Sequence, residues 1–229
     1  VLTGVLLAVI GQVYQTGADV FELFVAWAVL ILPWTLVSRS AVQWLLWLVV
    51  AEIALALYGE QVLLVVSDMT SEQLCTLVGA TVALALAARE VAVYRELAWL
   101  SAHWTRLVLL FAAVAILFGP AAGYVVDVGA IEWEMLCLGA FLVALVIATG
   151  VYWRLVPDFA ALVIVIGFAD TLFVCVGYRL IDETIEFSFD QAGPALTGFA
   201  SMIAWAIAGT GCAALAMRRL RHGLRESRA

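Results

Sequence analysis

Two carboxylic acids interrupt long apolar runs of this sequence. Glu52 lies near the middle of the run 41–66 and has at least six apolar residues on each side, and Asp170 lies near the middle of the run 158–181. An ionised carboxylate at that depth in a bilayer costs at least about 2.5–3.5 kcal/mol, so such a group pairs, faces water or keeps its proton. Two roles fit these residues: a proton or cation site of a transporter, or a neutral carboxyl that hydrogen-bonds between helices.

Other chemistries lack their residues. All 11 basic residues are Arg, so no lysine Schiff base can form. His103 stands apart from any H-E-x-x-H pattern, and no G-x-S-x-G occurs, so we predict no catalytic residue, metal or cofactor and rank a membrane-embedded enzyme last. The cysteines are far apart in the sequence and form no C-x-x-C: Cys75, Cys137, Cys175 and Cys212. The net charge of −7 gives no support for nucleic acid as a partner.

The composition indicates an integral membrane protein. Hydrophobic residues make up 66% of the 229 positions and charged residues 13%, with a mean hydropathy of +1.11. Soluble domains are roughly 45–50% apolar, and only lipid accepts the excess on outward faces. We predict an all-α bundle of about eight transmembrane helices, which a 4+4 internal duplication would explain. The predicted spans are 1–15, 20–37, 41–66, 72–93, 104–125, 134–155, 158–181 and 193–217.

The arginines predict the orientation of these spans. Ten of the 11 fall on one side if all eight spans cross, and the loops on the opposite side are acidic. The positive-inside rule makes the arginine side cytoplasmic. We therefore expect a multi-pass protein of the bacterial inner membrane, with a single transmembrane domain at 1–217 and a basic cytoplasmic tail at 218–229. Because the chain starts at Val1 inside an apolar run, we expect a truncated N-terminus.

The stretch GQVYQTGADVFELFVAWAVLILPW, at 11–34, begins with polar residues between two apolar runs. Asp19 and Glu22 have the spacing of a capping box at the start of the second span. Three polar side chains precede them and exceed what a tight turn needs. These three side chains either line a vestibule above Glu52 or hydrogen-bond neighbouring loops. With two tyrosines of later spans, the vestibule candidates are Gln12, Tyr14, Gln15, Tyr58 and Tyr178.

The same stretch resembles a bacterial family of predicted membrane proteins, domain of unknown function 2157. The matching features are G-Q-x-Y-Q-x-G-A-D at 11–19, L-F at 23–24, W-A at 27–28, L-P-W at 32–34 and W-L-L-W at 44–47. The resemblance is concentrated in residues 4–58 and implies a membrane location and further helices, with no assigned chemistry. Where the family pattern after W-L-L-W often has Asn, this chain has Glu52.

Similar contexts around the two acids predict a parallel 4+4 duplication. Glu52 lies between Arg39 and Tyr58, and Asp170 lies between Arg154 and Tyr178. Repeats that build a site at the membrane midplane are common in transporters. We therefore predict a small-solute or ion transporter coupled through Glu52 and Asp170.

The alternative is a structural or accessory subunit that scaffolds a partner protein. Small residues recur every four positions and allow close approach of helix backbones. They predict a membrane protein partner or a homo-oligomer, in addition to the lipid bilayer itself. The columns are Gly79, Ala83 and Ala87; Ala140, Ala144 and Ala148; and Ala204, Ala208 and Cys212.

Overall fold

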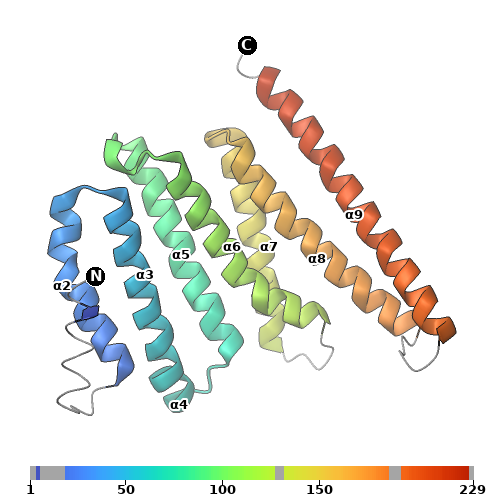
Figure 1. Cartoon of the computed structure of the whole chain (residues 1–229), viewed down its shortest axis with the longest axis horizontal. Helices are drawn as coiled ribbons and strands as arrows, with labels where there is room; N and C mark the ends of the chain where they lie inside the picture. The colour runs from blue at the N-terminus through green and yellow to red at the C-terminus, as the bar shows by residue number, and fades with distance from the viewer. Residues whose placement is uncertain (1–3, 6–18, 127–131, 186–191, 227–229) are drawn as a thin grey trace. The chain divides into compact units, whose positions relative to one another are not determined.

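The computed structural model describes residues 4–5, 19–126, 132–185 and 192–226, and this part of the chain is helical (Figure 1). The α-helices are α2 (Val20–Ser38), α3 (Ala41–Tyr58), α4 (Leu64–Val66), α5 (Ser71–Tyr94), α6 (His103–Val126), α7 (Glu132–Gly150), α8 (Phe159–Ile185) and α9 (Ala192–Glu226). Two π-helical turns, η1 (Gly59–Leu63) and η3 (Val151–Leu155), and one 3₁₀ turn, η2 (Ala98–Leu100), join them.

Seven of the described helical segments are long and apolar enough to cross a membrane. Their bounds are Val20–Ser38, Ala41–Val66, Ser71–Tyr94, His103–Val126, Met135–Leu155, Phe159–Ile181 and Ala200–Arg219. These segments confirm the last seven predicted spans, while the first, 1–15, lies almost wholly outside the described residues. The all-α membrane fold class is therefore confirmed, with a described count close to eight.

The chain forms two compact units, Val1–Ala113 and Val114–Ala229, whose boundary falls inside α6. In the first unit, α2 and α3 form a helical hairpin. Ala28 and Ile31 of α2 pack against Val50 of α3, and Trp47 covers this small core. The Trp47 indole N–H donates to the carbonyl oxygen of Ala28 at 3.1 Å, so a polar group within the span is satisfied by the neighbouring helix.

The helix starts correct one sequence prediction. Asp19 occupies the N-cap position of α2, but its side chain makes no capping hydrogen bond, so the predicted capping box with Glu22 is wrong. A capping box forms instead at α5, where Thr70 Oγ1 accepts from the Gln73 backbone N–H and Gln73 Oε1 accepts from the Thr70 N–H. Both boxes have the required spacing, and only the second has the side-chain geometry that closes it.

Asp158 caps α8, as the sequence predicts from an Asp that directly follows Pro157 at the start of the span 158–181. Its Oδ1 accepts from the backbone N–H groups of Ala160 at 3.0 Å and Ala161 at 3.3 Å. Pro157 precedes it and stops the preceding helix, because proline restricts the residue before it to extended backbone. This tight turn sets the adjacent ends of α7 and α8.

In the second unit, α9 packs against α8 through one aromatic side chain. Trp205 of α9 lies over Gly177 of α8, where a Cβ would overlap the indole. Its ring stacks on Phe173 with centroids 4.7 Å apart, and its N–H donates to the Phe173 carbonyl oxygen at 2.8 Å. Glycine at 177 is therefore what allows this close approach.

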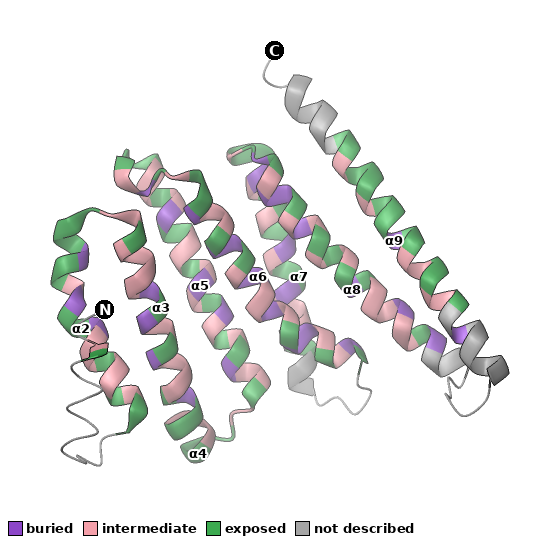
Figure 2. Ribbon diagram, viewed as in Figure 1, coloured by how far each residue is buried: buried purple, intermediate pink, exposed green. Residues whose placement is uncertain are grey.

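The rest of α9 is largely uncovered by this chain (Figure 2). Only 6% of its apolar window is buried, and Ala204, Ala208 and Cys212 are all exposed. The helix continues to Glu226, so residues 218–226 of the predicted basic tail extend α9 as a helix.

A substitution pair on α8 tests the packing of Trp205. We expect Gly177→Ala to lower the free energy of unfolding by about 1–3 kcal/mol, because the added methyl group overpacks the Trp205 contact. The measurement is unfolding by sodium dodecyl sulfate in mixed micelles. Gly167→Ala is the matched control on the same helix, since no atom lies within 4 Å of a Cβ placed there. Equal loss of stability in both variants would contradict the packing described.

Candidate functional site

The first predicted carboxylate, Glu52, contacts the span that follows it. Glu52 lies on α3 and is half-buried, and its Oε2 is 2.8 Å from the hydroxyl Oγ1 of Thr81 on α5. Thr81 is also half-buried and lies near the middle of its own span, ten residues after Ser71. The structure thus gives Glu52 a polar partner within the membrane-spanning part of the chain.

Thr81 has more hydrogen-bond contacts than it has protons to donate. Its Oγ1 is 2.8 Å from Glu52 Oε2 and 2.7 Å from the carbonyl oxygen of Val78. A hydroxyl carries one proton and also accepts, whereas a carbonyl only accepts. When the hydroxyl donates to Val78, the Glu52 contact is a hydrogen bond only if the carboxyl is protonated and donates to Thr81. When Glu52 is ionised, the hydroxyl must turn towards it and leave Val78 to its backbone partner.

The second predicted carboxylate, Asp170, lies at the interface of α8 and α9. It is half-buried, and its Oδ1 lies 2.6 Å from the position that a Cβ on Gly209 would take. Within the described residues Asp170 makes no hydrogen bond or ion pair. Gly209 is buried and lets the carboxyl group approach the backbone of α9.

The two acids have similar positions in their own units. Glu52 in Val1–Ala113 faces α5, and Asp170 in Val114–Ala229 faces α9, so each faces the membrane-spanning helix that comes next in the sequence. This relation is what a parallel duplication requires, and the duplication stays a prediction. The two acids belong to different units of the chain, so Glu52 and Asp170 each form a separate site.

Two of the predicted vestibule residues lie on described helices. Tyr58 makes an edge-on contact with Phe21 of α2, with ring centroids 5.3 Å apart, and so faces a different neighbour from Glu52. Six residues separate Tyr58 from Glu52, which is about 240° around a helix of 3.6 residues per turn. Tyr178 is half-buried on α8. The other three candidates lie outside the described residues: Gln12, Tyr14 and Gln15.

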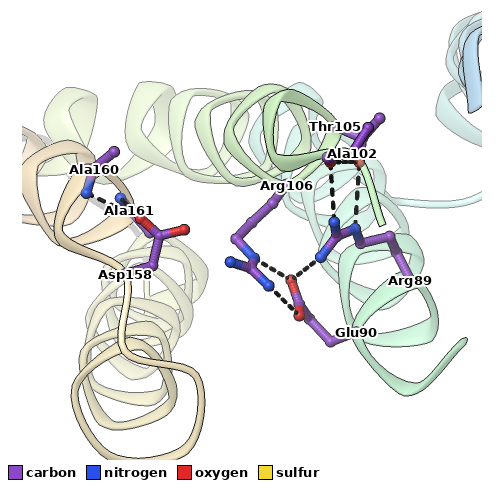
Figure 3. Close-up of polar contacts among 8 residues, drawn as sticks. All are labelled: Arg89, Glu90, Ala102, Thr105, Arg106, Asp158, Ala160 and Ala161. Carbon is purple, nitrogen blue, oxygen red and sulfur yellow. Dashed lines mark hydrogen bonds and ion pairs between the residues drawn. The ribbon is translucent and has the colours of Figure 1, made fainter. Parts of the chain in front are cut away.

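A cluster of charged side chains, which the sequence did not lead us to expect, joins α5 to α6 (Figure 3). Arg89 is only 1% exposed and donates to Glu90 Oε1 at 2.8 Å, to the Ala102 carbonyl oxygen at 3.0 Å and to Thr105 Oγ1 at 3.3 Å. Arg106 donates to both oxygens of Glu90, at 2.8 and 3.1 Å. Every polar arm of Arg89 therefore has a partner, as a buried guanidinium requires.

Two of the arginines that predict the orientation of the spans, Arg89 and Arg106, belong to this cluster. Arg89 and Arg106 share Glu90, so the three residues carry a net charge of +1. The sequence carried a signal, since Arg-Glu at 89–90 and Thr-Arg at 105–106 flank one short turn between two helices. The arrangement holds the turn in place and leaves Glu90 engaged, so we assign it a structural role.

No residues gather as metal ligands in the described part of the chain. Groups of three or more His, Cys, Asp or Glu side chains that could hold a metal ion do not occur there.

Infrared spectroscopy tests the hydrogen bond between Glu52 and Thr81. We expect the protein in lipid to show the carbonyl band of a protonated carboxyl that Glu52→Gln removes. In Thr81→Val this band should shift to higher frequency, because the carboxyl loses its hydroxyl partner. Asp170→Asn is the control and should leave that band in place. A spectrum in which neither Glu52→Gln nor Thr81→Val alters the protonated carbonyl region would contradict the assignment.

Comparison with known proteins gives one match. Residues 1–44 match the family model described as predicted membrane protein, DUF2157. The match includes the motif at 11–19 and confirms the resemblance, over a shorter range than the 4–58 expected. No curated protein and no solved structure matches. Glu52, Thr81 and Asp170 all lie beyond the matched residues, so their chemistry depends on this chain's own geometry.

Proposed function

We propose that this membrane protein is a small-solute or ion transporter, coupled through Glu52 with Asp170 as a second intramembrane carboxyl. The observation that supports it is the contact between Glu52 and Thr81, two half-buried groups near the middle of α3 and α5. Carboxyl groups at this depth are commonly part of proton or cation pathways.

Thr81 suits a group that changes its protonation state. A hydroxyl can accept from the neutral carboxyl and can donate to the ionised one, and rotation about one bond interconverts the two arrangements. The second contact of Thr81, with the Val78 carbonyl oxygen, gives its proton a place to go when Glu52 is neutral.

Asp170 has a different role in the proposal. It lies at the α8–α9 interface without a hydrogen bond in the described residues, and its Oδ1 fills the space that a side chain at Gly209 would take. We propose that it is the second titrating group of the pathway.

We also propose that the protein belongs to the inner membrane of a bacterium and that its C-terminus is cytoplasmic. The positions of three arginines support this orientation, because successive spans alternate in direction. Arg39 and Arg95 directly follow the first and third described spans, and Arg154 lies in the last turn of the fifth.

Reconstitution of the full chain tests proton coupling at Glu52. Proteoliposomes loaded with a pH-sensitive dye are given a potassium diffusion potential, and proton entry is followed by fluorescence. We expect wild-type protein to carry protons and Glu52→Gln to fall to the level of protein-free liposomes, because an amide cannot bind and release a proton. Thr81→Val should slow the flux, since one protonation state of Glu52 loses its partner.

The matched control is Glu60→Gln. Glu60 is an exposed carboxylate in η1, the turn that directly follows α3, and its replacement should leave the flux unchanged. Wild-type vesicles that carry no more protons than empty ones, or Glu52→Gln vesicles that match the wild type, would count against proton coupling.

The alternative function, a scaffold for a membrane partner, is favoured by α9. Its small-residue column of Ala204, Ala208 and Cys212 is exposed, although such columns favour close approach of helices. We take a second copy of this chain as the partner to test, because one exposed column can face its own copy about a two-fold axis.

Cysteine oxidation in isolated membranes tests this face. Self-association through α9 predicts a disulfide-linked dimer that forms through Cys212, persists in Cys75→Ser and disappears in Cys212→Ser. Ala208→Leu should abolish it by holding the helices apart. Cys75 is the suitable control because it is also exposed. If no Cys212-dependent dimer forms, the α9 face does not join two copies.

A further inference from the structure

A groove of about 480 Å³ runs between α7 and α8 within the second unit. One wall comes from α7 and η3, with pairs of residues at successive turns, and the other comes from α8. The lining residues are Leu145, Val146, Thr149, Gly150, Trp153, Arg154, Val165, Ile166 and Ala169. Both walls belong to segments long and apolar enough to cross a membrane, so the groove opens towards the bilayer.

The groove changes from polar to apolar along its length. Arg154 and Trp153 lie at the end next to the α7–α8 turn, and Leu145 and Ala169 lie at the deeper end. The eight helical steps from Leu145 to Trp153 correspond to about 12 Å of helix. A cation at the interface above an apolar trough has the same order of polarity as a lipid, whose phosphate lies above its acyl chains.

The polar groups at the upper end are unpaired within the protein. Neither the Arg154 guanidinium nor the Trp153 indole N–H has a hydrogen-bond partner in the described part of the chain, and both side chains are exposed. Tyr152, their neighbour, is buried at 2% exposure, which turns the next two residues outwards. By contrast, Thr149 donates its hydroxyl proton to the Leu145 carbonyl oxygen at 2.7 Å, so this hydroxyl does not need a hydrogen-bond partner from a ligand in the trough.

Glycine at position 150 keeps the trough open. No atom lies within 4 Å of a Cβ placed on Gly150, so a side chain there would extend into the groove. Gly150 directly precedes the π-helical turn η3, which carries Trp153 and Arg154. The residue that leaves space and the residues that supply charge are therefore on one short segment.

We propose that this groove binds one anionic glycerophospholipid, with its phosphate on Arg154 and Trp153 and an acyl chain along Val146, Gly150 and Ile166. The occupant follows from charge complementarity at the interfacial end and from the apolar trough that continues from it. A zwitterionic lipid of equal chain length binds less tightly, because its headgroup presents no net negative charge to Arg154.

Native mass spectrometry of the full chain in detergent tests the proposal. The delipidated protein is titrated with dioleoyl phosphatidylglycerol or dioleoyl phosphatidylcholine, and the first bound lipid is quantified. We expect phosphatidylglycerol to bind roughly fivefold more tightly, the effect of one arginine near an anionic headgroup. Arg154→Gln should remove this preference by weakening phosphatidylglycerol more than phosphatidylcholine, while Gly150→Leu should weaken binding of both lipids.

Matched controls separate the groove from general lipid contact. Arg218→Gln removes an exposed arginine of α9, and Gly167→Leu adds the same side chain to α8 where the surroundings are open; both should bind as the wild type does. Ala169→Phe fills the groove from its other wall and should repeat the effect of Gly150→Leu if that variant does not fold. Equal affinity for the two lipids, an unchanged preference in Arg154→Gln, or unchanged binding in both filled variants would overturn the proposal.

Discussion

Inside a bilayer, a polar group that enters a membrane-spanning helix must find its partner within the protein or among lipid headgroups, because the hydrocarbon offers none. Much of the described packing follows this constraint. The indole N–H groups of Trp47 and Trp205 each donate to a carbonyl oxygen of the neighbouring helix. These bonds join α2 to α3 and α8 to α9. Each bond therefore both satisfies a polar group and holds two helices together. The apolar contacts around them then complete each hairpin.

The charged cluster at the α5–α6 turn and the carboxyl group at the centre of α3 satisfy this constraint in different ways. Arg89 has partners on all sides, and Glu90 is held by two guanidinium groups, so a change in protonation would break several bonds at once. Glu52 has a single hydroxyl partner that can reverse the direction of its hydrogen bond. Full satisfaction makes the first arrangement rigid, and partial, reversible satisfaction makes the second suited to proton exchange. That contrast is the physical basis for placing the proposed coupling at Glu52.

Two polar groups on the surface of the second unit have no hydrogen-bond partner in the described part of the chain. Arg154 and Trp153 project from a widened helical turn at the upper end of an apolar groove, where a lipid phosphate can take the place of a protein acceptor. The exposed column on α9 is uncharged and needs no polar partner, so lipid tails or a second helix can cover it equally well. The two surfaces therefore differ in polarity. The groove has a charged group that can recognise a lipid headgroup, whereas the α9 face has none and can recognise a partner only by its shape.

The sequence alone predicts the membrane-spanning helices, because the length of an apolar run that crosses a bilayer follows directly from the thickness of that bilayer. It also located the α8 cap, since Asp158 acts on backbone groups only two and three residues away. The capping box predicted from the spacing of Asp19 and Glu22 does not form, because a capping box requires suitable side-chain rotamers as well as the right residues. Three contacts depend on how the helices pack and cannot be predicted from the sequence: Glu52 faces Thr81, Asp170 lies against Gly209, and Arg89 is buried with Glu90 and Thr105. An apolar helix in lipid has low amphipathicity, so its sequence does not mark which face meets a neighbour, and the partner of a polar group on it is set by packing across helices.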